Sequence, residues 1–383
     1  MKILRVVFSA DPKLGGVVEA VRLQQAPLNE LGVDVEIISC DSPDSTYLNG
    51  SLPVRALGPS VTGYGYTARL VPWLRANATR FDAVIVEGIW QYHSFAVWRA
   101  LAGSSTPYYV FTHGMLDPWF KHTYPLKHLK KWLYWPWAEY RVLRDARAVI
   151  FTCEEERLLA RQSFWLYLAN EVVAALGTSS PPSKNLELKQ NFLANYPELQ
   201  GRRIVLFLSR IHEKKGCDLL LEAFAKVAGQ DEELHLVMAG PDQAGWAAIL
   251  QAQAERLGIA QRITWPGMLQ GDAKWGAFYA ADVFCLPSHQ ENFGIVVAEA
   301  LACGKPVLIS NKVNIWREID EDSAGFVDDD TVDGTVRNLH RWLSLDAVAR
   351  TEMAERAKQC FAQRFRIQRA AERLLEVIRE HNR

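Results

Sequence analysis

The sequence has 383 residues, of which 49% are hydrophobic and 23% are charged, and its formal net charge is -1. This length favours two domains over a single core, and the composition is that of a globular chain. The near-neutral charge leaves no basic excess for a general affinity for nucleic acid. No apolar run approaches the roughly 20 residues that cross a bilayer, and the N-terminal run is too short for a signal peptide. We therefore expect a cytoplasmic protein, with its six scattered cysteines reduced and buried.

The first half of the chain alternates predicted strands with predicted helices. A β-branched run over 3–8 predicts a strand, and a loop with Gly15 and Gly16 follows. A helix is expected over 17–31, ended by Gly32, before a second strand over 33–39. This βαβ order implies a parallel sheet with a right-handed crossover. Further strands are expected at 83–86, 108–111, 148–151 and 172–175, and a long surface loop at 41–66.

The alternation restarts after 177–185, a stretch rich in Ser and Pro that is the clearest linker signal in the chain. The expected strands are 204–208, 234–238, 283–286 and 306–309, and the expected helices are 218–227, 246–257, 294–303 and most of the chain from 337. The sequence thus predicts an α/β fold with two Rossmann-like domains, 1–180 and 181–365, and a last helix, 366–383, returning to the first. Since open α/β sheets bind ligands beyond the carboxyl ends of their strands, we expect the site in a cleft between the domains.

Two cations lie on the short loop that follows the strand 204–208. Arg210 offers a planar fork of donors and Lys215 a compact charge, and together they can converge on a pyrophosphate. The alternative is a solvated charged turn.

Two glutamates with the spacing Glu-x7-Glu follow the strand 283–286. Glu291 lies in the loop, whereas Glu299 lies inside an otherwise apolar helix, where burial is costly without a polar partner. A sugar diol such as that of ribose would supply two donors, and the start of the helix suits an anion. The alternative is a glutamate on a solvent-facing side of the helix.

Two weaker signals follow strands of the first half. His113 stands next to Gly114 at the end of the strand 108–111, although a core histidine bonded to a backbone carbonyl is an alternative. The loop with Gly15 and Gly16 suits a close approach of phosphate but lacks the GxGxxG pattern, which argues against a nicotinamide-dependent enzyme.

Together these four loops resemble the bacterial retaining glycosyltransferases of family four, which have the GT-B fold. The resemblance covers essentially the whole chain and is strongest over 204–310. Its most specific element is Arg210 with Lys215-Gly216, combined with Glu291-x7-Glu299. The segment His113-Gly114-Met115-Leu116 looks like the subset that builds cell-envelope polysaccharides.

The resemblance implies a role for each of these residues. Arg210 and Lys215 would bind the donor diphosphate, Glu299 would hold the ribose, and Glu291 would contact the donor sugar. The remaining donor-binding positions would be the backbone of Asn292, Phe293 and Gly294, the loop of Gly15 and Gly16, and Met268 and Leu269 around the base. His113 would lie beside the anomeric centre and the C6 hydroxyl of the sugar.

The implied reaction needs no metal or cofactor, because cations and a helix end neutralise the leaving diphosphate. The acidic run 328–330 is interpreted as a solvated turn, and Asp117 is a candidate for handling the acceptor. Leu176-Gly177-Thr178 departs from the Asn-Gly usual in the family, and Ser209 stands where glycine is common.

The expected donor is a UDP-sugar, UDP-glucose above all, and the expected acceptor a saccharide, lipid-linked in envelope or extracellular polysaccharide assembly. A UDP-sugar epimerase on the same fold and an inactive nucleotide-sugar-binding scaffold are the alternatives. Basic and aromatic residues interleave over 121–137, which is typical of a surface at a lipid interface. We therefore predict peripheral contact with the inner face of the plasma membrane. The alternative is an ordinary helix with its Trp side chains in the core.

Overall fold

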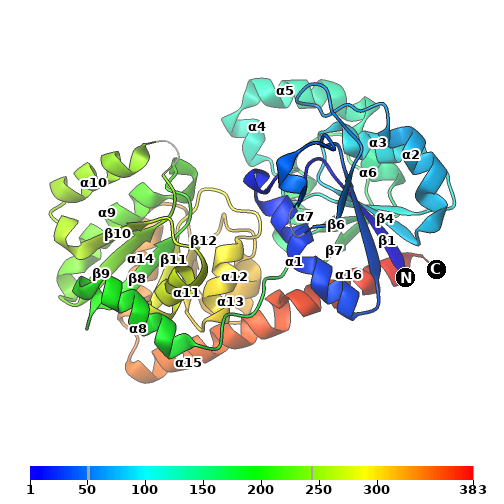
Figure 1. Ribbon diagram of the computed structural model, residues 1–383. Helices are drawn as coiled ribbons and strands as arrows, with labels where there is room; N and C mark the ends of the chain where they lie inside the picture. The colour runs from blue at the N-terminus through cyan, green and yellow to red at the C-terminus, as the bar shows by residue number, and fades with distance from the viewer. Residues whose placement is uncertain (50–51, 243–244, 383) are drawn as a thin grey trace. The chain divides into compact units, whose positions relative to one another are not determined.

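The computed structural model describes residues 1–49, 52–242 and 245–382 (Figure 1). The chain forms two compact units. Unit 1 is Met1–Gly177 together with Ile367–Arg383, and unit 2 is Thr178–Arg366. The break between them lies within the stretch 177–185, whose Pro and Ser residues suit an irregular connection.

Unit 1 is built on a parallel sheet with the strand order β3-β2-β1-β4-β5-β6-β7. The strands are β1 (Lys2–Val7), β2 (Asp34–Ser39), β3 (Val54–Ala56), β4 (Ala83–Glu87), β5 (Tyr108–Phe111), β6 (Ala148–Phe151) and β7 (Glu171–Val173). The helices are α1 (Gly16–Glu30), α2 (Leu70–Asn77), α3 (Tyr92–Leu101), α4 (Trp119–Thr123), α5 (Pro125–Tyr134), α6 (Glu139–Asp145), α7 (Glu154–Ala160) and α16 (Ile367–His381).

The core of unit 1 follows from the apolar runs of its central strands. Every residue of β4 is buried, as expected for a parallel strand covered by helices on both faces. Helix α1 ends before Gly32, which adopts φ +75, a conformation that favours glycine. The last helix, α16, packs against α1 (Figure 1). The hydroxyl of Tyr109 on β5 donates to Asn382 Oδ1 at 2.7 Å, so the end of the chain completes unit 1.

Unit 2 is built on a second parallel sheet with the order β10-β9-β8-β11-β12-β13. Its strands are β8 (Arg203–Leu208), β9 (Leu234–Ala239), β10 (Ile263–Gly267), β11 (Val283–Leu286), β12 (Val307–Ser310) and β13 (Gly325–Asp328). Its helices are α8 (Asn185–Asn195), α9 (Cys217–Val227), α10 (Trp246–Arg256), α11 (Gly271–Ala280), α12 (Ile295–Ala302), α13 (Trp316–Glu321), α14 (Val332–Leu343) and α15 (Ala347–Cys360). The two sheets confirm the predicted pair of Rossmann-like parallel-sheet domains.

Three strands that the sequence pattern did not indicate all lie at sheet edges. These strands are β3, β10 and β13. Edge strands are half-covered and carry no continuous apolar run, so their pattern resembles that of a loop. The strand β3 falls inside the predicted loop 41–66, of which residues 50–51 lie outside the described part of the chain.

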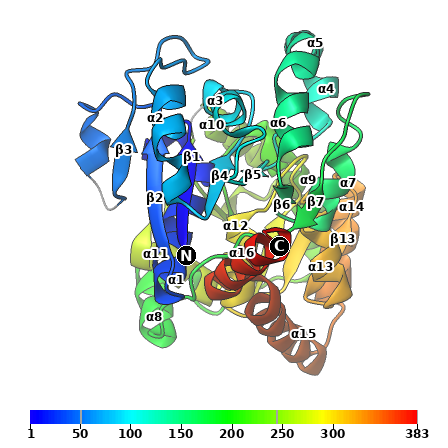
Figure 2. The same ribbon diagram turned by 90° about the vertical axis from the view of Figure 1, so that its right-hand side faces the viewer.

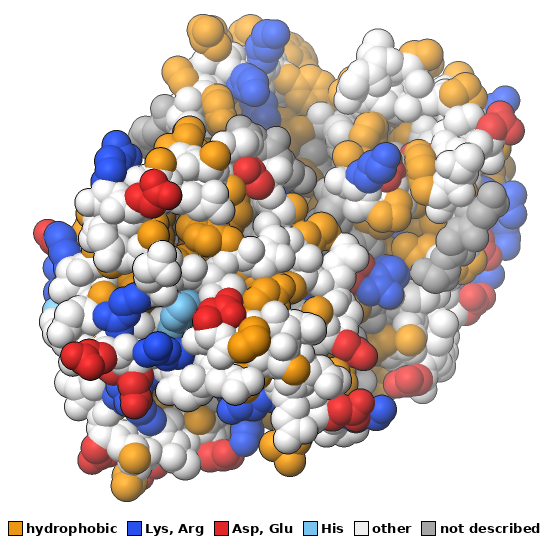
Figure 3. Space-filling model, turned by 60° about the vertical axis from the view of Figure 1, so that its left-hand side comes forward, with side chains coloured by type: hydrophobic (Ala, Val, Ile, Leu, Met, Phe, Trp, Pro, Cys, Tyr) orange, Lys and Arg blue, Asp and Glu red, His pale blue; other side chains and the backbone are white. Residues whose placement is uncertain are grey.

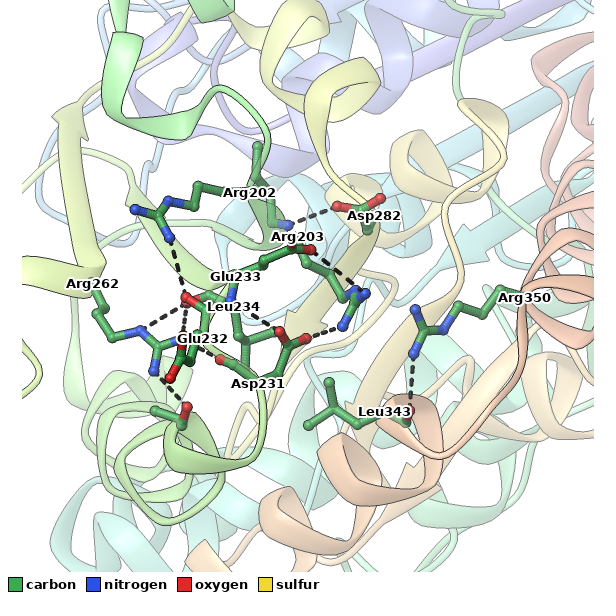
Figure 4. A network of polar contacts seen from close by, with 12 residues as sticks. Arg202, Arg203, Asp231, Glu232, Glu233, Leu234, Arg262, Asp282, Leu343 and Arg350 are labelled. Carbon is green, nitrogen blue, oxygen red and sulfur yellow. Dashed lines mark hydrogen bonds and ion pairs between the residues drawn. The ribbon is translucent and has the colours of Figure 1, made fainter.

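A cluster of arginines holds the amino-terminal edge of the sheet in unit 2 (Figure 4). Arg262 donates to the backbone carbonyls of Ala228 and Leu234 at 2.5 and 2.7 Å, and Arg203 pairs with Asp231. Arg262 thus satisfies backbone carbonyls beside the start of β9, on the edge opposite the carboxyl ends of the strands, and Arg203 binds a carboxylate there. On the surface shown in Figure 3, basic and acidic side chains are interspersed. This mixture agrees with the near-neutral net charge.

The rim of unit 1 carries an apolar helix surface on α5. Helices α4 and α5 lie at this rim, beyond the sheet (Figures 1 and 2). The described side chains of α5 include no buried one. Leu126 is 79% exposed, and Leu133 and Trp137 are also exposed. His122, in the predicted segment 121–137, has a side chain outside the described set. In the described ranges no helix is both long and apolar enough to span a membrane.

Candidate active site

Loops that follow neighbouring strands of unit 2 are joined at the carboxyl edge of its sheet. The side chain of Ser288 and the backbone N–H of His289, after β11, both donate to the carbonyl of Lys214, after β8, at 2.9 Å. Gly216 makes this approach possible. Its φ is +65, and a Cβ there would lie 2.1 Å from the carbonyl oxygen of Pro287. The backbone therefore fixes the lysine-bearing loop against the glutamate-bearing loop.

Lys215 and Glu291 form an ion pair where these two loops meet. The Lys215 side chain is 7% exposed and that of Glu291 is 22% exposed. The backbone of Glu291 is also held, since its N–H donates to Lys312 and its carbonyl accepts from Asn314, both at 2.9 Å. The structure thus brings together two of the predicted site residues and shields the lysine from water.

Glu299 is buried on α12, with 6% of the residue exposed. Lys274 of α11 places its Nζ 2.6 Å from Glu299 Oε1. The alternative of a solvent-facing glutamate is wrong, and the expectation that a buried carboxylate here needs a polar partner is confirmed. Sequence reasoning did not identify Lys274. A glutamate in an otherwise apolar helix predicts a polar or cationic partner, but the sequence does not identify which residue this partner is.

The other predicted donor-binding residues differ in their exposure and contacts. Arg210 is exposed, and no described residue forms a hydrogen bond or ion pair with it. This side chain therefore agrees with the alternative of a solvated charged turn. Met268 is exposed and Leu269 half-buried after β10. The Asn292 side chain accepts from Asn314 Nδ2 at 3.3 Å. Phe293 is buried against Phe365, and Gly294, with φ +69, is the N-cap of α12.

His113 lies at the carboxyl edge of the sheet in unit 1, just after β5. Its Nε2 is 2.7 Å from Glu87 Oε2, and its ring stacks on Phe111 with the centroids 5.0 Å apart. The alternative of a core histidine satisfied by a backbone carbonyl is wrong, because the partner is a carboxylate. Buried Glu156 supports the loop by accepting from Gly114 N and Thr112 Oγ1, both at 2.6 Å.

The glycine loop after β1 is exposed. A Cβ added at Gly15 or Gly16 would meet no atom within 4 Å, and Gly15 has φ +82. The loop therefore leaves open space around its backbone. Asp117 is buried and accepts from the backbone N–H of Trp119 at 2.8 Å, so it forms an Asx-turn just before α4.

The acidic run 328–330, which starts at the last residue of β13, is held by side-chain contacts. Asp328 accepts from Arg337 Nε at 2.9 Å, and Asp330 lies 2.8 Å from His289 Nδ1. Within the described ranges, no group of three or more His, Cys, Asp or Glu residues is arranged to hold a metal ion. The predicted burial of the cysteines is confirmed, since all six are free and buried.

Comparison with known families covers both units. The family model "Glycosyl transferase 4-like domain" matches residues 15–175, and the model "Glycosyl transferases group 1" matches residues 189–360. The chain belongs to the glycosyltransferases, with a group 1 domain in unit 2. The predicted family resemblance is confirmed at this level by two matches that together span most of the chain.

Solved structures of glycosyltransferases share the fold of this chain. HepE of Anabaena in complex with UDP has a TM-score of 0.79 and 19% identity, covering 99% of this chain and 100% of its own. Sucrose-phosphate synthase from Thermosynechococcus elongatus has a TM-score of 0.75 and 18% identity, covering 99% and 98%. These likenesses establish the GT-B fold.

Among curated relatives, the D-inositol 3-phosphate glycosyltransferase of Segniliparus rotundus is 39% identical over 112 residues. That match spans 28% of this chain and 24% of the relative. The corresponding enzyme of Mycolicibacterium gilvum is 41% identical over 109 residues, again 28% of this chain and 24% of the relative. The chain thus spans about a quarter of the length of the curated relatives it matches.

Proposed function

We propose that this chain is a retaining glycosyltransferase that moves glucose from UDP-glucose to a saccharide acceptor without a metal ion. The observation that carries the proposal is the ion pair between buried Lys215 and half-buried Glu291 beside the start of α12. A lysine held out of water by a carboxylate is a ready phosphate ligand, because an incoming anion can take over the same donors.

The proposed chemistry starts from this pair. As the bond between the sugar and the diphosphate breaks, negative charge grows on the phosphate oxygens. Lys215 exchanges Glu291 for these oxygens, while the free backbone N–H groups at the start of α12 add their dipole. Arg210, on the same loop and without a protein partner in the described structure, supplies the second cation. Glu291, released from Lys215, accepts hydrogen bonds from the sugar hydroxyls.

The nucleoside is held by Glu299 and the loop after β10. The ribose hydroxyls donate to Glu299, whose Oε1 is already oriented by Lys274 at 2.6 Å. Exposed Met268 and half-buried Leu269 receive the base. In this proposed site the carboxylates bind hydroxyl groups and the cations bind the phosphates. The departing phosphate accepts the proton of the acceptor hydroxyl, so no side chain is needed as a general base.

The choice of UDP and glucose is supported by the fold rather than by a base-specific contact. HepE, which shares the fold, has been solved with UDP and glucose. Lys215, Glu291 and Glu299 suit any nucleoside diphosphate sugar, since none of these side chains is proposed to contact the base. UDP-glucose is therefore the first donor to test.

For the acceptor we propose a lipid-linked saccharide used in envelope polysaccharide assembly, reached from the inner face of the plasma membrane. The surface of α5 supports this choice, because Leu126 and Leu133 are exposed on the same helix as exposed Lys127 and Lys130. Trp137, in the turn that follows α5, is also exposed. An apolar strip with lysines beside it suits the boundary between acyl chains and anionic head groups.

A thermal-shift screen of UDP, GDP and ADP and their glucose conjugates tests the donor, since a ligand that binds the native state raises the melting temperature. Labelled UDP-glucose then separates the activities. Slow hydrolysis or transfer supports the proposal, an epimerised donor indicates the epimerase alternative, and binding without turnover indicates a scaffold. Calorimetry of Glu299→Ala should show UDP binding weakened about 10-fold or more, the effect of losing a charged hydrogen-bond acceptor. Unchanged affinity would remove the ribose contact.

A further inference from the structure

Two buried charged side chains, Arg5 and Glu87, lie next to His113 in unit 1, and we call this chain of contacts the relay. Glu87, the last residue of β4, pairs in register with Val7 on β1 and Phe111 on β5. Because side chains alternate along a strand, Arg5 on β1 projects from the same face of the sheet as Glu87. Arg5 Nε donates to Glu87 Oε1 at 2.7 Å, and both side chains are 0% exposed.

The second oxygen of Glu87 faces the ring of His113. Oε2 of Glu87 lies 2.7 Å from Nε2, and the His113 side chain is 5% exposed. His113 has φ +49, a backbone conformation that is uncommon for a residue with a side chain. The ring is therefore held from two sides, by stacking on Phe111 and by a carboxylate, at a strained backbone position.

The Arg5–Glu87 pair adds little to stability, because the attraction between two buried charges does little more than offset the cost of taking them out of water. Arg5 Nη1 has no hydrogen-bond partner in the described structure, which adds to its cost. What the pair does provide is an ionised Glu87. Burial alone would raise the pKa of this carboxyl, but the charge of Arg5 and the contact with His113 hold the pKa below its ordinary value.

We propose that Glu87 is a positioning residue for His113 and that Arg5 keeps Glu87 ionised for this purpose. An ionised carboxylate can only accept, so the His113 proton stays on Nε2 and its Nδ1 is left to accept from a sugar hydroxyl. The third titratable neighbour is His93, whose Nε2 lies 3.0 Å from the backbone carbonyl of Glu87. Burial lowers the pKa of His93 to about 4, so His93 stays neutral and adds no competing charge.

The role of Nδ1 toward sugar rests on the proposed glycosyl transfer, whereas the tautomer itself does not. Two-bond ¹⁵N–¹H correlation spectra of histidine-labelled protein report the tautomer directly, with His113→Asn to assign the signal. We expect the proton on Nε2 in the unsubstituted protein. A proton on Nδ1 would overturn the proposal even if no UDP-sugar is ever turned over.

The matched double variant Arg5→Met/Glu87→Met removes the relay without leaving a buried charge. Such an exchange for apolar side chains tends to preserve stability, so its melting temperature should stay near that of the parent. We expect mixed His113 tautomers and a kcat about 10- to 100-fold lower, the range for losing a partner that orients a histidine, with the donor KM within about threefold. Unchanged kcat and an unchanged tautomer would contradict the relay.

The single variant Arg5→Met adds a pH readout. Without the arginine the pKa of Glu87 rises, so the acid limb of the kcat profile should move to higher pH, with activity recovering as Glu87 ionises. A uniform loss at every pH would indicate a merely structural arginine. Tyr109→Phe is the control, because it removes the hydrogen bond to Asn382 from the same sheet and should leave both the profile and the tautomer unchanged.

Discussion

Half-buried Lys274 of α11 and buried Glu299 of α12 form an ion pair, with Nζ 2.6 Å from Oε1. Glu299 is thus neutralised by the protein before any ligand arrives. The same carboxylate is the proposed ribose acceptor, so ligand binding and this ion pair should be energetically coupled.

Lys274→Met should reveal that coupling. The free protein should lose about 1–3 kcal/mol, because the buried carboxylate loses its hydrogen-bonded contact with the lysine. UDP should then raise the melting temperature more in the variant than in the parent, since ribose hydroxyls replace the lost donor. Lys226→Met removes an exposed pair with Asp333 and should change neither quantity. An equal or smaller UDP effect in Lys274→Met would show that Glu299 does not meet the ribose.

Lys215→Ala and Arg210→Ala should each lower glycosyl transfer by at least about 10²-fold, the effect of removing one donor from a developing oxyanion. Steady-state rates with UDP-glucose measure this effect. Lys226→Ala serves as the control lysine in the same unit. Full activity of both site variants would mean that the diphosphate binds elsewhere.

Removal of divalent metal should leave the activity intact. Lys215, Arg210 and the start of α12 supply the positive charge that a metal would otherwise provide. The measurement is the transfer rate after dialysis against EDTA. Loss of activity with recovery on addition of Mn²⁺ would refute the metal-free mechanism.

Glu139 makes unit 1 sensitive to pH. The residue is fully buried on α6 and accepts from Trp90 N and Ser94 Oγ at 2.8 and 2.9 Å. Burial raises its pKa to about 7, although these two donors and Lys131 act in the opposite direction. Between the ordinary pKa of a glutamate and about 7, the folded protein binds more protons than the unfolded chain. Stability therefore falls as pH rises through this window.

Glu139→Gln removes this dependence. Its amide oxygen can still accept both hydrogen bonds, so relative to the parent the variant should gain up to about 3 kcal/mol between pH 5 and pH 8. Urea unfolding at several pH values measures the difference, with exposed Glu30→Gln as the control. Parallel stability curves for Glu139→Gln and its parent would show that Glu139 titrates normally.

The α5 surface should bind anionic vesicles. Replacing Leu126 and Leu133 with Asn removes two exposed apolar side chains. The affinity for phosphatidylglycerol vesicles, measured by co-sedimentation, should fall by up to about 10³-fold, because each fully buried leucine contributes about 2 kcal/mol. Leu186→Asn changes an equally exposed leucine on α8 and should have no effect. Absence of vesicle binding by the parent protein would remove the membrane proposal.

The central strands and the site loops could be predicted because they depend on local pattern. Apolar runs such as 83–86 admit few other structures, and ligand-binding loops follow the carboxyl ends of such strands. Glu299 was recognisable because a charge stands out in an apolar helix. By contrast, α11 contains Gly271 and Gly276, which disfavour a helix, and so it was missed.

Tertiary contacts explain what the pattern could not reveal. Gly276 is required because a Cβ there would lie 2.6 Å from the carbonyl oxygen of Leu188 on α8. The partners of the site residues are also determined by tertiary packing. Glu87 precedes His113 by 26 positions and Lys274 precedes Glu299 by 25, and neither spacing signals contact. Both pairs form only once parallel strands or neighbouring helices are assembled.

The place of α16 in unit 1 has a consequence for synthesis of the chain. The sheet of unit 1 emerges from the ribosome before unit 2. Helix α16, which packs against α1 and lies near Tyr109, is translated only after the whole of unit 2. Nascent unit 1 must therefore keep an uncovered apolar face while nearly two hundred further residues are added. Such a face is a natural target for chaperones, and slow translation of unit 2 would lengthen the time for which it is open to aggregation.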